Sequence, residues 1–132
     1  MALITKDANA SPDASTAMFA AQIPDAVAGE DLTVCSAAFL NGADGLVYMA
    51  SGAAAGAKVH GFVPRNVKRG QPVTLLGPGT RFRGAAAGLQ PGQPVYLGAT
   101  KGTLDTAPTA GDAVGIAFAM SPTDIIFARY AI

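Results

Sequence analysis

The sequence has almost none of the residues from which active sites and metal centres are usually built. It contains one histidine (His60), one cysteine (Cys35), one glutamate (Glu30) and no tryptophan, and only 14% of its residues are charged. A single cysteine excludes an intramolecular disulfide and a cysteine-based zinc site, and a single histidine excludes a histidine cluster around a metal. We therefore expect no catalytic residues, no cofactor and no metal site.

The residues that could carry chemistry also have ordinary structural interpretations. Cys35 is expected to be a small buried hydrophobe in a strand, and His60 a partly buried or surface residue of a short strand. Asp44, Asp112 and Asp124 lie near glycine or proline, where turn chemistry favours aspartate. The serines lie outside any Gly-x-Ser-x-Gly motif. An enzyme is therefore the least favoured of the function classes.

Long apolar runs are also missing. No basic stretch followed by an apolar segment opens the chain, and no segment approaches the length of a membrane span. Half of the 132 residues are hydrophobic, but 28 residues are alanine. Large apolar side chains are therefore few, so we expect one domain with a thin core that gains burial from neighbouring subunits.

What the sequence does contain is a phrase that occurs three times in its second half. A glycine, a polar residue and a proline or alanine precede a short apolar run in Gly70–Leu75, Gly92–Leu97 and Gly111–Ile116. The copies start 22 and 19 residues apart. That spacing is too short for a strand with a crossover helix, but it suits a strand, a turn and a second short strand.

The chain is therefore predicted to be all-β, a small β-barrel or sandwich of about eight or nine short strands. Glycine and proline separate the expected strands, and the prolines at strand starts remove an N–H where the loss costs little. The expected strands cover residues 32–39, 46–49, 59–63, 73–76, 81–83, 95–97, 103–104, 112–120 and 125–130. Residues 51–57, a Gly/Ala stretch, are either a loose loop or a close backbone contact.

Residues 1–27 differ from the rest and are predicted to form an extended N-terminal arm preceding a domain over residues 28–132. Residues 1–12 show no sustained periodicity, and Ser15 or Thr16 can cap one helical turn, through Ala20, that Pro24 stops. Either this terminus is disordered, or it binds another chain, for example by adding a strand to its sheet. Its four large apolar residues favour the arm: Leu3, Ile4, Phe19 and Ile23.

The net charge is zero, but the charges are sorted along the chain. Residues 1–44 hold six acidic residues and one basic residue, and residues 45–104 hold seven basic residues and no acidic one. A basic middle can indicate nucleic acid, an acidic partner or the acidic arm of a neighbour. Few aromatic residues lie among the cations, so we expect no direct contact with nucleic acid. The candidate contact residues of the middle are Arg65, Lys68, Arg69, Arg81 and Arg83, although Arg81 and Arg83 also fit a solvated strand face.

Several phrases, in this order, resemble the small capsid decoration proteins of tailed bacteriophages, also called head-stabilising or cement proteins. The phrases are Gly29–Leu32, Gly45–Ala50, Val59–Phe62, Gly88–Leu97, Leu104–Pro108 and Gly111–Ala117, followed by a last strand. The resemblance covers residues 28–132 and leaves residues 1–27 outside. These phrases are structural rather than chemical, and other glycine-rich β modules share them singly.

The resemblance implies a structural virion protein without catalytic residues, made in the cytoplasm of a bacterial host. Proteins of this family bind the outer surface of the expanded capsid and cross-link neighbouring major capsid subunits against internal DNA pressure. The implied partners are the major capsid protein and other copies of the chain, with a homotrimer favoured and a dimer as the alternative. No membrane partner is implied.

A second function class stays open: a β module that binds a sugar or a peptide on a virion or cell surface. Such a module usually presents a platform of aromatic side chains. This chain has no tryptophan and three tyrosines, Tyr48, Tyr96 and Tyr130. Clustered, exposed aromatics would favour this class, and a pocket that joins His60 to a carboxylate would favour an enzyme.

Overall fold

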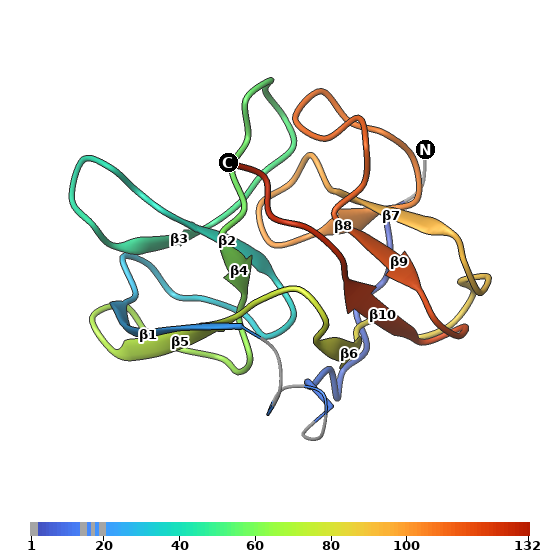
Figure 1. The fold of residues 1–132 in the computed structure, drawn as a ribbon, viewed down its shortest axis with the longest axis horizontal. Coiled ribbons are helices and arrows are strands. Elements are labelled where there is room, and N and C mark those ends of the chain that lie inside the picture. The colour runs from blue at the N-terminus through green and yellow to red at the C-terminus, as the bar shows by residue number, and fades with distance from the viewer. Residues whose placement is uncertain (1–2, 14–15, 17, 19–20) are drawn as a thin grey trace.

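The computed structural model describes residues 3–13, 16, 18 and 21–132, and these form ten β-strands (Figure 1). The strands are β1 (Gln22–Val27), β2 (Ala37–Leu40), β3 (Val47–Met49), β4 (Gly61–Phe62), β5 (Pro72–Leu76), β6 (Arg81–Arg83), β7 (Pro94–Leu97), β8 (Leu104–Asp105), β9 (Ala117–Ala119) and β10 (Asp124–Phe127). The predicted all-β class is confirmed.

The strands form two antiparallel sheets of five strands each, which lie side by side in Figure 1. The first sheet has the order β1-β5-β4-β2-β3, and the second has the order β6-β10-β9-β7-β8. The two ends of the first sheet, β1 and β3, do not pair as strands, and an isolated bridge between Ala28 and Val47 is the contact given there. The architecture is therefore a small sandwich of two sheets rather than a closed barrel.

Three phenylalanines join the two sheets at the centre of the larger core. The ring of Phe62, from β4 of the first sheet, lies 5.3 Å from the ring of Phe82 and 4.7 Å from that of Phe127, which belong to β6 and β10 of the second sheet. All three side chains are fully buried. Aromatic pairs at such distances add to the burial of their apolar area.

The first sheet is buried on both faces. Neighbouring residues of one strand enter different cores: Ala37 and Leu76 pack in the larger cluster, whereas Ala38 and Leu75 pack in a second cluster. The loops around Leu32 and Val67 cover that second cluster and pair with each other. Strands buried on both faces are apolar at consecutive positions, which explains the pairs of alanines and leucines in β2 and β5.

The single chain is as compact as its mass predicts. It exposes 6338 Å², close to the ~6,400 Å² that a compact monomer of this mass is expected to expose. The core is divided between the larger cluster and a second cluster of small aliphatic residues behind the first sheet.

The structure also differs from the sequence prediction at residues 22–27, which were expected to belong to an arm. They form β1, which pairs with β5 of the same chain. The pairing shifts between Ile23 and Ala26, where Asp25 has a φ of 62°. Pro24 and this bulge are tolerated because β1 is an edge strand. The predicted helical turn falls largely on residues outside the described ones.

The strand expected over residues 112–120 is correct only for Ala117–Ala119. A turn replaces its first half because the Asp112 carboxylate accepts hydrogen bonds from the backbone N–H groups of Leu97, Val114 and Gly115. The three distances lie between 2.8 and 3.2 Å. An aspartate that bonds to the backbone ahead of it favours a turn over a strand.

We expect replacement of Phe62 by alanine to lower the free energy of unfolding by about 3–5 kcal/mol, because the cavity would lie between the two sheets. Phe118→Ala is the matched control: Phe118 is 38% exposed on β9, and its loss is expected to cost about 1 kcal/mol or less. Urea denaturation of dilute protein measures both values. Equal destabilisation by the two variants would contradict the central role of Phe62.

Candidate interaction surfaces

The described N-terminal segment, residues 3–13, lies along the second sheet of its own chain. The Ile4 N–H donates to the Leu104 carbonyl of β8 at 2.9 Å, and the Asp13 N–H donates to the Arg81 carbonyl of β6 at 2.6 Å. Between these points the segment exchanges hydrogen bonds with residues 83–86. Because β8 and β6 are the two edge strands of this sheet, one segment covers both edges (Figure 1).

Two charged side chains of this segment, Lys6 and Asp7, bind residues of the rest of the chain. The Lys6 ammonium donates to the Ser36 hydroxyl at 3.0 Å and to the Thr33 hydroxyl at 3.3 Å, and burial lowers the pKa of Lys6. The Asp7 carboxylate pairs with the Arg83 guanidinium at 2.9 Å. The Asn9 backbone N–H and then the Arg83 guanidinium hold the pKa of Asp7 below its ordinary value.

The four apolar residues predicted to contact another chain have different surroundings. Leu3 is 54% exposed, whereas Ile4 packs against the larger core and Ile23 packs against the second cluster from β1. Phe19 lies outside the described residues. The structure thus leaves Leu3 available to a partner and places Ile4 and Ile23 against their own chain.

The sorted charges largely find each other within the chain. Three acidic residues of the first third pair with basic residues of the middle, in the pairs Asp7–Arg83, Glu30–Lys101 and Asp31–Lys68. Arg81 pairs with Asp124 at 2.6 Å. Three of the five predicted basic contact residues, Lys68, Arg81 and Arg83, are therefore already engaged.

The other two, Arg65 and Arg69, lie on an exposed loop over residues 64–71, which we call the basic loop. No ion pair among the described residues involves either of them. The Arg65 guanidinium donates only to the Pro72 carbonyl at 3.3 Å. The Lys68 and Arg69 backbone N–H groups bond to the side chains of Gln71 and Asp31, so the loop presents its cations from a fixed turn.

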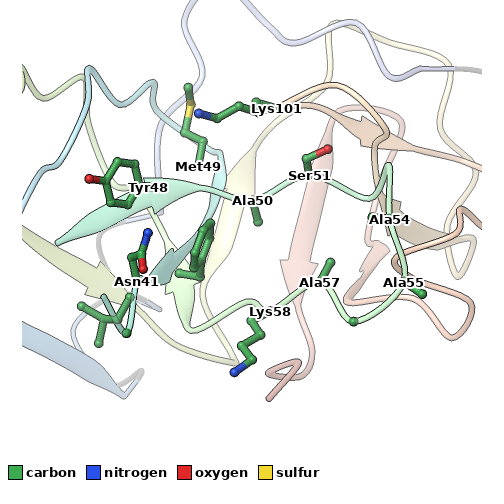
Figure 2. A pocket seen from close by; sticks show the side chains of 14 residues that line it. Asn41, Tyr48, Met49, Ala50, Ser51, Ala54, Ala55, Ala57, Lys58 and Lys101 are labelled. Carbon is green, nitrogen blue, oxygen red and sulfur yellow. The ribbon is translucent and has the colours of Figure 1, made fainter. Parts of the chain in front are cut away.

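A shallow groove of about 560 Å³ lies between the β2–β3 hairpin and residues 51–58 (Figure 2). Its lining includes the rings of Phe39 and Tyr48, whose centroids are 6.2 Å apart, and the side chains of Lys58 and Lys101. The Gly/Ala stretch that borders it includes a close backbone contact, because a Cβ on Gly52 would collide with the carbonyl oxygen of Leu97. Sequence reasoning did not find this groove.

Tyr48 is held in place at the groove by a carboxylate. Its hydroxyl donates to Asp44 Oδ2 at 2.5 Å, which raises the pKa of Tyr48 and lowers that of Asp44. Lys101, on the other side, pairs with Glu30 at 2.5 Å. The groove therefore offers a fixed aromatic ring together with the side chains of Lys58 and Lys101.

The outer face of the second sheet, the side away from the core, carries exposed apolar side chains. In β9 and the residue after it, Ala117 and Ala119 are buried, whereas Phe118 is 38% and Met120 48% exposed. Ile116, directly before β9, is fully buried. The large residues of this strand thus point outward.

The two most reactive side-chain types of the sequence have structural roles. Cys35 is buried, and burial raises the pKa of its thiol to about 12. It lies in a turn with a φ of 59° rather than in the predicted strand. His60 Nδ1 accepts a hydrogen bond from the Leu40 N–H at 3.0 Å, which ties β2 to the start of β4. Within the described residues, no group of three histidine, cysteine or acidic side chains is placed to hold a metal ion.

Comparisons with family models, curated proteins and solved structures find no match to this chain. The described part of the chain contains no helix with the length and apolar character needed to cross a membrane.

We expect Asp7→Asn to loosen the N-terminal segment at neutral pH. The lowered pKa means that the carboxylate holds Arg83 at any pH above its ordinary pKa of about 3.9 and releases it as the pH falls through the lowered value. Hydrogen exchange at the Asp7, Arg83 and Ala86 amides measures the loosening. The protection factors of these amides, which correct for the intrinsic exchange rate at each pH, should be several-fold lower in the variant at neutral pH than in the wild type, and the wild type should lose the same protection in strong acid.

Asp25→Asn is the matched control, because it removes the same charge from β1, where no ion pair of the described residues involves Asp25. It should leave exchange in the N-terminal segment unchanged. Wild-type protection in Asp7→Asn at neutral pH would show that Asp7 does not hold the segment.

Proposed function

We propose that this protein is a structural component of a phage virion that binds the exterior of the mature capsid. It cross-links neighbouring major capsid subunits and thereby stabilises the head against internal DNA pressure. The partners are the major capsid protein and other copies of the chain, as a homotrimer or a dimer. The role requires no catalytic residue and no cofactor, and the chain is made in the cytoplasm of the bacterial host.

The observation that carries this proposal is the ordered set of phrases that resemble the decoration family. Several of these phrases contain a strand together with the turn that leads into it. Residues 45–50 contain β3, residues 59–62 contain β4, and residues 88–97 end in β7. Within them, Gly45, Gly88 and Gly92 have positive φ angles of 73°, 95° and 83°, which favour glycine. The resemblance therefore concerns the residues that determine the sandwich.

The basic loop is the surface best suited to an acidic patch of the capsid. Arg65 and Arg69 are exposed cations that form no ion pair with any of the described residues, on a loop whose backbone is tied to Asp31 and Gln71. Exposed charges on a fixed loop accelerate encounter and set orientation more than they add affinity. Many copies on a closed shell make weak single contacts durable, because each linked contact raises the effective concentration of the next.

We expect the purified protein to co-sediment in stoichiometric amounts with undecorated expanded capsids. The double variant Arg65→Gln, Arg69→Gln should bind at least about tenfold more weakly at low salt. Lys58→Gln, which removes one exposed cation from the groove, is the control and should bind like the wild type. Failure of the wild-type protein to bind capsids would refute the proposed function.

A second candidate function, a β module that binds a sugar or a peptide, is favoured by the groove with its fixed Tyr48 ring. If this function is correct, Tyr48→Ala should abolish retention of the protein on a glycan or peptide array. Capsid binding should then be absent in the wild type. The same substitution should leave capsid binding intact if the first proposal is correct.

A further inference from the structure

We propose that the outer face of the second sheet is the contact between two copies of this chain, packed with the same face toward each other. This inference rests on the proposed function, because it identifies the surface through which two copies of the proposed virion protein bind each other. The face is built by β7, β9, β10 and β6, with exposed Phe118 in the middle of β9 and exposed Met120 directly after that strand.

The first observation is the inverted pattern of β9. A strand of a sandwich normally directs its large apolar residues inward and its polar residues outward. Here the inward positions are Ala117 and Ala119, both at most 5% exposed, and the outward positions are phenylalanine and methionine. Such a pattern is expected for a strand with a partner on both sides.

The second observation is that the apolar residues are continuous across strands. Phe118 is paired with Pro94 of β7 on one side and with Ile126 of β10 on the other, and Ile126 is paired with Arg81 of β6. Residues directly opposite in antiparallel strands project from the same face. The row from Pro94 through Phe118 to Ile126 therefore forms an apolar strip, with Met120 two positions beyond Phe118.

The third observation concerns charge at the border of the strip. The Arg81 guanidinium contacts the Asp124 carboxylate through both Nε and Nη2 at 2.6 Å, and Arg83 is paired with Asp7. The border cations are therefore balanced within the chain, so a charged partner gains little there. A second copy brings the same balanced border, and a chain with zero net charge does not repel its copies at long range.

The edges of the second sheet are not free for pairing. The N-terminal segment already bonds to the edge strands β6 and β8 through Asp13 and Ile4. Among the described residues of the second sheet, a copy therefore finds no free strand edge to extend, and it packs against the face, as sheets do in sandwiches. A standard contact buries about 800 Å² per partner, roughly an eighth of the 6338 Å² that this chain exposes.

The test compares the full-length wild-type protein with Phe118→Thr, Met120→Thr by sedimentation velocity over a range of concentrations. The wild type should form a dimer that dissociates on dilution, and the double variant should associate at least about tenfold more weakly. Val27→Thr is the matched control, because Val27 is 37% exposed on β1 of the first sheet. A monomeric wild type, or a double variant that dimerises equally well, would overturn the proposal.

A cross-linking experiment gives a readout that misfolding does not imitate. Phe118→Cys, treated with a short bis-maleimide, should yield a covalent dimer in high yield, whereas Val27→Cys should not. The buried Cys35 thiol, with a pKa of about 12, contributes no background. Equal yields from the two variants would also overturn the proposal.

Capsid co-sedimentation of the same variants separates this inference from the proposed function. A wild type that dimerises but ignores capsids refutes the function and leaves the pairing face intact. A wild type that decorates capsids as a monomer, and loses this binding in Phe118→Thr, Met120→Thr, assigns the face to the capsid and overturns the pairing between copies.

Discussion

The contact of Phe62 with Phe82 and Phe127 is the interaction on which the arrangement of the sheets depends. Phe62 is contributed by β4, which is only two residues long and lies between β5 and β2. The preceding residue has to be glycine, because a Cβ on Gly61 would lie 2.7 Å from the Cβ of Leu75. Gly61 therefore lets β4 approach β5, and that approach places the Phe62 ring between the two sheets.

The strands that the sequence predicts correctly are those marked by a local pattern of apolar residues, glycine and proline. Strands β3, β5 and β7 follow from apolar runs bounded by glycine and proline, and β6 follows from the alternation of arginine, phenylalanine and arginine; the positions of all four are confirmed. Strand β1 was missed because Pro24 and Asp25 are poor strand residues, which an edge strand with a bulge accepts. The sequence indicates a turn at Asp112, but not that it delays the strand until Ala117, because the hydrogen bonds from backbone groups of two segments to the Asp112 carboxylate leave no trace in apolar periodicity.

The candidate surfaces were predictable only in part. Charge sorting is visible in the sequence, but the partner of each charge is not, since residues such as Asp7 and Arg83 lie 76 positions apart. The direction of Phe118 could not be read either, because β9 is apolar on both faces and its alternation does not tell inside from outside. The groove depends on the spatial meeting of a hairpin and a loop, which sequence does not show.

The docking of the first third of the chain onto its middle decides which surfaces remain for partners. It covers both edges of the second sheet and balances Arg83, Lys101 and Lys68. The surfaces left include the groove beside the β2–β3 hairpin, exposed cations on the basic loop of the first sheet, and an apolar strip on the outer face of the second. Because the basic loop and the apolar strip belong to different sheets, a partner at one would not cover the residues of the other. The contact of Phe62 with Phe82 and Phe127 fixes how these two surfaces are placed relative to each other, because it joins the two sheets.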